Sequence, residues 1–448
     1  MRKNLIFNSF PTTNRNIFNK NQNSGQVKII LVNTSDTIGG AAVACRRLLD
    51  ALFQSGTDVK MLVEEKLGKD EKVISINNNF LSKKFHFFRF ALEYLYFLKF
   101  ERAKGNELHF SPALFGTDIS KHPIIQQADI INLHWTNNSF ISINNLGSLM
   151  KLKKPIVWHL HDLWAFTGGC HHPGNCPNFE ISCGNCPILK NSGSTDLSAR
   201  IWKRKSEIYA NADITIVTPS EWLANIARRS SLFKNITIQN IPNPIDKNIF
   251  MPIEKNKAKQ QLGLDVQKNY ILFGAVNTGN KRKGFDYFKE ALKIFQQNYS
   301  SPNEIELLAL GKVDNNLFSQ LPYKINSFGT VNNTDKIIQI YNAASVFVTP
   351  SLEENLPNMI MEAMSCGTAT IGFNTGGIPE MIEHKKNGFV AEYKSAKSLS
   401  EGINWVLNFL EPMLLSALTR EKVLNNYSNE IVAKKYNLLF KELLEKRN

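Results

Sequence analysis

Strand-like and helix-like segments alternate along most of the chain, and this alternation restricts the fold more than any other feature. The strand-like segments are short runs rich in β-branched and other apolar residues, bounded by turn residues. The expected strands are 27–32, 58–63, 129–134, 155–160, 213–217, 270–276, 305–310, 345–349 and 369–373. Because strands separated by helices pair in parallel, the pattern predicts an α/β fold with helix-covered parallel sheets.

The length of 448 residues exceeds that of a usual single domain. The segment 241–246 contains two prolines, which stiffen the chain and indicate a boundary. We therefore expect a first domain over 27–241 and a second over 242–420. Residues 1–26 are polar and rich in asparagine, so we expect a disordered extension without a signal peptide. The contents of 43% hydrophobic and 21% charged residues, with no apolar span, indicate a cytoplasmic globular protein.

An acidic loop and a helix follow the expected strand 345–349. Pro357 suits the first turn of this helix, and Gly367 suits its end. Glu354 therefore precedes the helix, and Glu362 lies within it. A carboxylate beside a helix N-terminus can accept hydrogen bonds from hydroxyl groups, while the free N–H groups and the helix dipole favour phosphate. Sugar hydroxyls and a diphosphate need this combination.

Two adjacent glycines, Gly376 and Gly377, follow the expected strand 369–373. A glycine pair lets the backbone approach a ligand closely. Taken alone, the two glycines are explained by an ordinary turn, and Glu354 and Glu362 are explained as solvent-exposed charges. Taken together, these features indicate a nucleotide-sugar site.

The segment 350–382 reads PSLEENLPNMIMEAMSCGTATIGFNTGGIPEMI and resembles the E-x7-E signature of retaining glycosyltransferases of family 4. The resemblance extends over about residues 27–440. It implies the GT-B fold, in which two Rossmann-like domains with parallel sheets face each other across a cleft. It also implies that a C-terminal helix within 421–448 crosses back to the first domain.

The resemblance assigns roles to the glutamate pair. Glu362 corresponds to the residue that holds the nucleotide ribose, and Glu354 to the residue that lies against the donor sugar. Asn355, Leu356 and Pro357 stand where the family usually has Gly-Phe-Gly. This departure concerns the contacts of the donor sugar more than the fold.

Two loops at strand ends are candidates for phosphate contacts. Gly39 and Gly40 follow the first strand, where an ordinary strand-to-helix turn is the alternative. Arg282 and Lys283 follow the strand 270–276, and both residue types bind phosphate, although a solvated basic loop is the alternative. The resemblance implies that the glycine loop faces the cleft and that Lys283 binds the donor diphosphate. Arg282 is a candidate substitute for the family arginine that is missing near Asn277.

His161 and Asp162 follow the expected strand 155–160. An imidazole can donate to or accept from a sugar hydroxyl, whereas a buried histidine with internal partners is the plainer alternative. The resemblance implies that His161 faces the donor sugar and that Asp162 orients it. His159 is a weaker candidate.

A cysteine-rich loop occupies 167–187. Its four cysteines are Cys170, Cys176, Cys183 and Cys186. This C-x5-C-x6-C-x2-C spacing predicts a structural zinc with no catalytic role, with His171 or His172 as alternative ligands. A disulfide pair or four reduced thiols are the alternatives. The run resembles an insertion found in one branch of family 4.

The formal net charge of +14 favours phosphates, nucleic acid or an anionic membrane. Residues 82–105 combine cations with many aromatic residues, which suits either an interfacial helix or a helix packed on a sheet. An interfacial helix would place the protein peripherally at the inner face of the plasma membrane.

The resemblance implies a glycosyltransferase that moves a sugar from a nucleoside-diphosphate sugar, with retention, to a glycan or polyprenyl-linked acceptor. We expect a role in bacterial surface polysaccharide assembly, such as capsule, exopolysaccharide or O-antigen. No catalytic cofactor and no nucleic-acid partner are expected. The alternatives are an epimerase or phosphorylase of the same fold and, less favoured, a basic zinc-containing nucleic-acid-binding protein.

Overall fold

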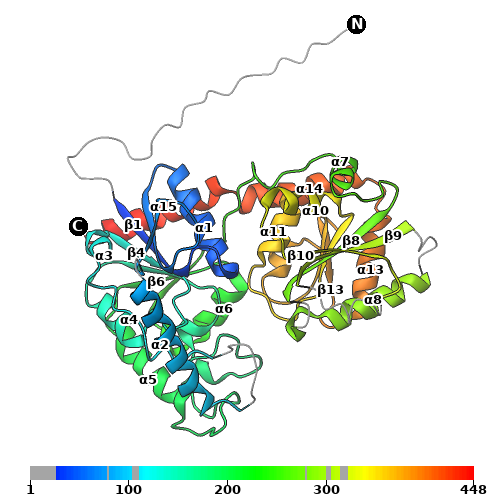
Figure 1. Ribbon diagram of the computed structural model, residues 1–448. Helices are drawn as coiled ribbons and strands as arrows, with labels where there is room; N and C mark the ends of the chain where they lie inside the picture. Colours follow the sequence, from blue (N-terminus) through cyan, green and yellow to red (C-terminus); the bar gives the residue numbers. More distant parts are fainter. Residues whose placement is uncertain are drawn as a thin grey trace.

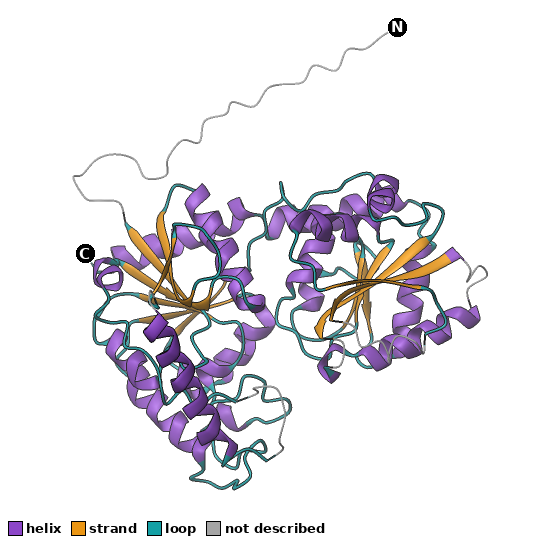
Figure 2. Ribbon diagram, viewed as in Figure 1, coloured by secondary structure: helices purple, strands orange, loops and turns teal. Residues whose placement is uncertain are grey.

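The computed structural model describes residues 27–77, 80–102, 110–277, 280–298, 304–312 and 321–447. These residues form two α/β domains, each with a parallel sheet covered by helices (Figure 1, Figure 2). This architecture confirms the expected fold class. The expected disorder of 1–26 concerns residues outside the described ranges.

The first domain contains a seven-stranded parallel sheet in the order β3-β2-β1-β4-β5-β6-β7. Its strands are β1 (Lys28–Ser35), β2 (Asp58–Glu65), β3 (Val73–Ser75), β4 (Ile130–Leu133), β5 (Ile156–His159), β6 (Ile214–Thr218) and β7 (Thr237–Asn240). Its helices are α1 (Gly39–Gln54), α2 (Phe80–Leu98), α3 (Pro123–Gln127), α4 (Ile143–Met150), α5 (Leu197–Tyr209) and α6 (Glu221–Arg229), with 3-10 turns η1 (Trp164–Phe166), η2 (Asn178–Glu180) and η3 (Ser231–Phe233).

The second domain contains a six-stranded parallel sheet in the order β10-β9-β8-β11-β12-β13. Its strands are β8 (Asn269–Asn277), β9 (Ile305–Lys312), β10 (Ile325–Gly329), β11 (Val346–Thr349), β12 (Thr370–Phe373) and β13 (Gly388–Ala391). Its helices are α7 (Lys255–Gln261), α8 (Phe285–Asn298), α10 (Thr334–Ala343), α11 (Asn358–Ser365), α12 (Ile378–Met381) and α13 (Ala396–Leu407), with the 3-10 turn η4 (Lys281–Lys283).

The chain passes from the first domain to the second near Ile245 and returns near Ser428, and these two segments lie side by side. Ile245 of the first crossing accepts a hydrogen bond from the N–H of Asn429 at 3.2 Å and donates its own N–H to Tyr427 at 2.8 Å. Helix α14 (Pro412–Asn426) packs on α11, and α15 (Asn429–Glu445) packs on α1. Apolar residues of α15 complete the core beside β1 and α1, so the last helix belongs structurally to the first domain (Figure 1).

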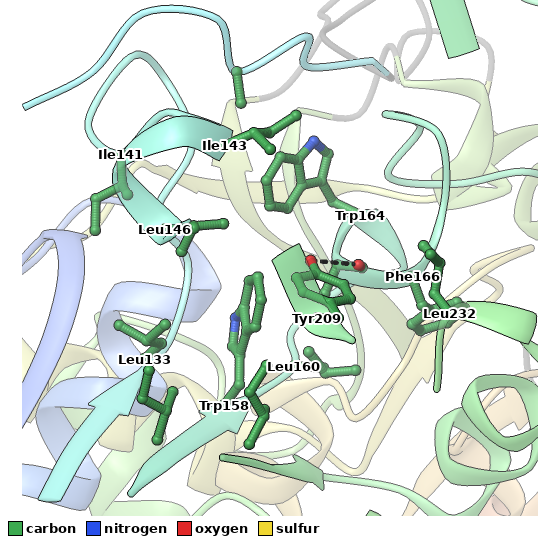
Figure 3. Close-up of a cluster of buried hydrophobic side chains, with 14 of the residues drawn as sticks. Leu133, Ile141, Ile143, Leu146, Trp158, Leu160, Trp164, Phe166, Tyr209 and Leu232 are labelled. Atoms are coloured by element: carbon green, nitrogen blue, oxygen red, sulfur yellow. Dashed lines mark hydrogen bonds between the residues drawn. The ribbon is translucent and has the colours of Figure 1, made fainter. Parts of the chain in front are cut away.

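A cluster of buried aromatic and aliphatic side chains supports the loop that follows β5 (Figure 3). The rings of Trp158 and Tyr209 meet edge to face with centroids 6.1 Å apart. The hydroxyl of Tyr209 donates to the carbonyl of Ala165 at 2.9 Å. The loop after β5 is therefore held from beneath by packed rings and a buried hydrogen bond.

Each sheet has a point where the strand order reverses. In the first sheet β1 lies between β2 and β4, and in the second β8 lies between β9 and β11. Open parallel sheets bind ligands beyond the carboxyl ends of strands at such points. The loops after β1, β5, β8 and β11 carry most of the predicted site residues. Among the helices described, none has the length and apolar character that a membrane crossing requires.

Candidate functional site

A cavity of about 220 Å³ lies between the two domains. It has walls from both domains, which the loops at the strand ends provide. The predicted site residues that line it are Gly40, His161, Arg282, Lys283, Glu354, Asn355 and Leu356. The other four residues predicted to contact the donor, Gly39, Glu362, Gly376 and Gly377, are absent from this lining. The structure therefore brings together the histidine of the first domain and the basic and acidic loops of the second.

His161 lies just beyond β5, and its Nε2 is 3.0 Å from Nδ1 of His134. Burial lowers the pKa of His161 to about 4, against a smaller opposing effect of Asp162. Burial also holds the pKa of His134 well below its usual range. The imidazole at the cavity wall is therefore neutral near pH 7, where it can exchange hydrogen bonds but carries no charge.

Asp162 is the centre of a second hydrogen-bonded chain. Its carboxylate accepts from Nε1 of Trp135 at 2.9 Å and lies 2.7 Å from Nδ1 of His171. The other ring nitrogen of His171 is 2.8 Å from the hydroxyl of Ser111. Burial alone would raise the pKa of Asp162, but His171 and the hydrogen bonds hold it well below its usual range. His171 thus holds the aspartate beside His161.

Lys283 and Glu354 form an ion pair at the floor of the cavity. Both belong to the second domain, Lys283 from η4 and Glu354 from the loop after β11. Gly284 ends η4 with φ +69°, and a Cβ there would lie 1.9 Å from the carbonyl oxygen of Pro350. The basic loop and the acidic loop are therefore packed backbone to backbone, and only glycine fits at 284.

Arg282 lines the cavity beside Lys283. Its Nε and Nη1 are buried and have no hydrogen-bond partner among the described residues. A buried guanidinium with unused N–H groups is costly, so this arrangement favours an anionic ligand at the cavity.

Gly376 and Gly377 pack against the backbone of the acidic loop that carries Glu354. The N–H of Gly377 donates to the carbonyl of Asn355 at 2.8 Å, and a Cβ on Gly376 would lie 1.6 Å from the carbonyl oxygen of Glu354. Both glycines therefore fix the backbone that presents Glu354. A direct contact of Gly376 or Gly377 with a donor stays a prediction.

Glu362 lies on α11 at the boundary with the first domain. Its Oε1 is 2.6 Å from Nη2 of Arg47 on α1, and its Oε2 accepts from the hydroxyl of Tyr341 at 2.8 Å. Neither partner was expected, because Arg47 is 315 residues away in sequence and Tyr341 lies on another helix. A contact of Glu362 with a ribose stays a prediction.

Further hydrogen bonds join the domains around the cavity. The hydroxyl of Ser220 donates to Oδ1 of Asn355 at 2.6 Å, and Nδ2 of Asn358 donates to the carbonyl of Gly40 at 3.2 Å. Gly39 has φ +87° and begins α1. The loop after β1 thus lies against the start of α11. The family resemblance predicts that the donor binds in this region.

The cysteine-rich loop forms part of the cavity wall through His172, whose Nδ1 is 3.0 Å from Oε1 of Glu353. Beneath the loop the fully buried Lys205 donates to the carbonyls of Trp164 and Thr167. These contacts anchor the loop between the β5 core and the second domain.

The four clustered cysteines are free thiols, and burial raises the pKa of Cys183 to about 11. In the part of the chain that the structure describes, no group of three or more His, Cys, Asp or Glu is arranged to hold a metal ion. A structural zinc on Cys170, Cys176, Cys183 and Cys186 stays a prediction that metal analysis of the purified protein would test.

The two Rossmann-like domains with parallel sheets have the GT-B fold. Sucrose-phosphate synthase from Thermosynechococcus elongatus superposes with a TM-score of 0.64 at 17% identity, over 94% of this chain and 100% of the other. Anabaena HepE, solved with UDP and glucose, gives a TM-score of 0.59 at 16% identity, over 93% of this chain and all of its own. At these identities the likeness shows the fold.

Residues 254–411 match the protein family described as "Glycosyl transferases group 1". The chain therefore carries a glycosyltransferase group 1 domain of the GT-B type, and it has glycosyltransferase homologues. An uncharacterised glycosyltransferase of Methanocaldococcus jannaschii is 23% identical over 91% of this chain and 95% of its own length.

Other relatives match over a shorter stretch. An uncharacterised glycosyltransferase of Haemophilus influenzae is 28% identical over 39% of this chain, and the α-1,3-galactosyltransferase of Escherichia coli that acts on GlcNAc-diphosphoundecaprenol is 28% identical over 43%. The aligned region spans about half the length of these two relatives, 47% and 50%.

Proposed function

We propose that the protein transfers a sugar from a nucleoside-diphosphate sugar to a glycan or polyprenyl-linked acceptor, with retention of the anomeric configuration. The observation that carries this proposal is the cavity between the domains, where His161 of the first domain meets Arg282, Lys283 and Glu354 of the second. Two cations, a carboxylate and a neutral imidazole suit a diphosphate joined to a sugar.

The diphosphate would bind to Lys283 and Arg282 and to the first turn of α11. Lys283 is already held by Glu354, and Arg282 has buried N–H groups without partners among the described residues. Phosphate oxygens would satisfy those groups, and the backbone N–H groups at the start of α11 would add to the positive potential. These contacts stabilise the charge that develops on the departing diphosphate.

The sugar would lie between His161 and Glu354. The neutral imidazole exchanges hydrogen bonds with a sugar hydroxyl, and the carboxylate accepts from another. In the transfer, the bond from the anomeric carbon to the phosphate oxygen breaks, and a bond to the acceptor oxygen forms on the same face. The proton of the acceptor hydroxyl passes to the departing phosphate oxygen, so no protein nucleophile is required.

We propose an acceptor used in the assembly of bacterial surface polysaccharide, such as capsule, exopolysaccharide or O-antigen. The support comes from the relative that acts on a sugar-diphosphoundecaprenol. A polyprenyl-linked acceptor would require the protein to work at the cytoplasmic face of a membrane.

Helix α2 provides a surface that suits such a position. Phe85, Phe87 and Phe88 are 60%, 70% and 56% exposed, and Leu95 on the same helix is 57% exposed. Exposed aromatic rings on a protein of net charge +14 suit the headgroup region of an anionic leaflet. Of the region 82–105, residues 103–105 lie outside the described ranges.

Sedimentation with vesicles that contain phosphatidylglycerol tests this position. We expect the protein to bind anionic vesicles more than neutral ones, and Phe87→Glu to weaken that binding. The matched control is Leu410→Glu, which changes an exposed leucine of the second domain. Equal binding of both variants and the unaltered protein would contradict a membrane role for α2.

Release of nucleoside diphosphate from UDP-, GDP-, ADP- and dTDP-sugars tests the reaction class. We expect slow release from donors of one nucleotide base, with proton NMR showing that the freed sugar first appears in the donor's anomeric configuration. Inversion would contradict retention. Isomerised nucleotide sugar without release of diphosphate would favour an epimerase, and release that requires inorganic phosphate would favour a phosphorylase.

A further inference from the structure

Arg47 is a residue of the first domain whose side chain reaches the second. It lies on α1, and its Nη2 is 2.6 Å from Oε1 of Glu362 on α11. The ring of Phe250 lies under the guanidinium, 5.1 Å from ring centroid to Cζ. Both members of the ion pair are largely enclosed, with side-chain exposures of 15% for Arg47 and 13% for Glu362. The guanidinium is therefore held in one orientation at the boundary between the domains.

One nitrogen of this guanidinium, with its two N–H groups, is unused. Nη1 of Arg47 is buried and has no hydrogen-bond partner among the described residues. An arginine stays charged at all ordinary pH values, so it cannot relieve this cost by losing a proton. Most buried polar groups have partners, and a buried donor without one calls for an acceptor that belongs to a ligand or a water.

Glu362 has the complementary capacity. Its Oε1 faces Arg47, and its Oε2 accepts from Tyr341. An ionised carboxylate can accept about four hydrogen bonds in all, so about two sites remain. The pair thus offers an unused donor on Arg47 beside unused acceptor sites on Glu362. A hydroxyl group both donates and accepts, and two adjacent hydroxyls would use both sides of the pair.

We infer that Arg47 completes the ribose subsite from the first domain and makes the protein selective for ribonucleotides over 2′-deoxyribonucleotides. This inference rests on the proposed function and on the prediction that Glu362 holds the nucleotide ribose. Nη1 of Arg47 donates to a hydroxyl oxygen of the ribose, and the hydroxyl hydrogen points to Glu362. A 2′-deoxyribose lacks one of the two hydroxyls and leaves part of this network unmade.

The position of the Arg47–Glu362 pair between the domains sets the order of nucleotide binding and domain closure. Arg47 and Glu362 belong to different domains, and Nη1 is enclosed where the domains touch. A nucleotide therefore enters while α1 and α11 are apart. Arg47 reaches the ribose as the domains close, so its hydrogen bonds to the ribose hydroxyls form only on closure.

Calorimetric titration with three matched nucleotide pairs tests the inference. The probes are UDP, GDP and ADP, each with its 2′-deoxy analogue, because the sequence does not specify the base. We expect the unaltered protein to bind the ribonucleotide of at least one pair about tenfold or more tightly than its deoxy analogue. Arg47→Ala should lose most of this preference by weakening the ribonucleotide about tenfold, with little change for the deoxynucleotide.

Arg46→Ala is the matched control, because Arg46 is the neighbouring arginine on α1 and pairs with Asp50 and Asp70 of its own domain. It should retain the preference. Arg47→Lys serves if the alanine variant does not fold. It keeps the charge beside Glu362 but lacks the planar fork of N–H groups, and should lose at least about threefold of the preference.

An Arg47→Ala protein that binds ribonucleotide as tightly as before, or more tightly, overturns the inference, as does an unchanged ribo-to-deoxy ratio. Such a result leaves the proposed function standing if Glu362→Ala still weakens nucleotide binding. Absence of binding to every nucleotide in the unaltered protein overturns both.

Discussion

Nδ1 of His134 lies 3.0 Å from Nε2 of His161, so the histidine at the cavity wall rests on a second histidine beneath it. His159 adds a third ring, whose centroid is 4.8 Å from that of His161 and whose Nδ1 is 2.5 Å from the hydroxyl of Tyr436 on α15. The cavity wall is thus connected through buried rings to the helix that crosses back from the second domain.

This histidine cluster predicts acid sensitivity. Burial lowers the pKa of His134, His159 and His161, the last to about 4 from an ordinary 6.5. Below pH 6.5 these histidines bind protons in the unfolded chain but not in the folded chain. Their contribution to the free energy of unfolding is therefore greatest above pH 6.5 and falls as the pH drops toward 4. For His161 alone the loss is about 3 kcal/mol. Urea unfolding at pH 7, 5.5 and 4.5 measures it.

His161→Phe should make the loss of stability between pH 7 and 4.5 smaller, because the imidazole at the cavity wall no longer titrates. A free energy of unfolding that is equal or higher at pH 4.5 than at pH 7 in the unaltered protein would contradict the prediction.

His161→Ala should reduce turnover about ten- to hundredfold while changing donor affinity less. In the proposed function the imidazole orients the sugar, whereas Lys283 and Arg282 on the cavity lining would hold the diphosphate. Steady-state release of nucleoside diphosphate gives both parameters. His384→Ala, which changes a histidine outside the cavity lining, is the control. A variant with unchanged turnover and a raised KM would place His161 in ground-state binding instead.

Gly284→Ala should destabilise the second domain by about 2–3 kcal/mol, because the new Cβ would meet the carbonyl oxygen of Pro350 at 1.9 Å. Gly263→Ala is a close control: its φ is also +69°, but a Cβ there has nothing within 4 Å. The difference between the two midpoints in urea isolates the steric clash from the cost of the left-handed backbone. Equal losses in the two variants would show that the basic and acidic loops are not packed as described.

Glu380→Ala should lower the free energy of unfolding by about 1 kcal/mol and loosen contact between the domains. The Glu380 carboxylate of the second domain accepts the backbone N–H groups of Glu221 and Trp222, at 2.8 and 2.7 Å, at the start of α6 in the first. Thermal unfolding and the radius of gyration from X-ray scattering measure the two effects. The control is Glu401→Ala, an exposed charge on α13. A variant identical to this control would mean that the cap across the domain boundary contributes nothing.

Much of the fold could be predicted from the sequence, because central strands of parallel sheets are apolar on both faces and read as continuous apolar runs. The strands that were not predicted, β3, β7, β10 and β13, are the edge strands of the two sheets. β7 and β10 are only partly buried and mix polar with apolar residues, and β3 has three residues. The sequences of β3, β7 and β10 carry little signal because an edge strand lacks a partner strand on one side.

The site was predicted less completely. Loops at strand ends identified His161, Lys283 and Glu354, because the carboxyl ends of parallel strands meet at one edge. Arg47 and Tyr341 could not be found in this way, since each lies on the face of a helix and meets Glu362 only through tertiary packing. Likewise, no local pattern shows that Gly376 and Gly377 support the Glu354 loop from behind.

A thermal-shift panel of UDP-, GDP-, ADP- and dTDP-sugars, on the unaltered protein and on Glu362→Ala, tests for a nucleotide-sugar site between the two domains. We expect donors of one nucleotide base to raise the melting temperature of the unaltered protein, and this rise to be lost or much reduced in the variant. No stabilisation by any nucleotide sugar, or an equal rise in both proteins, would contradict a donor site between the two domains.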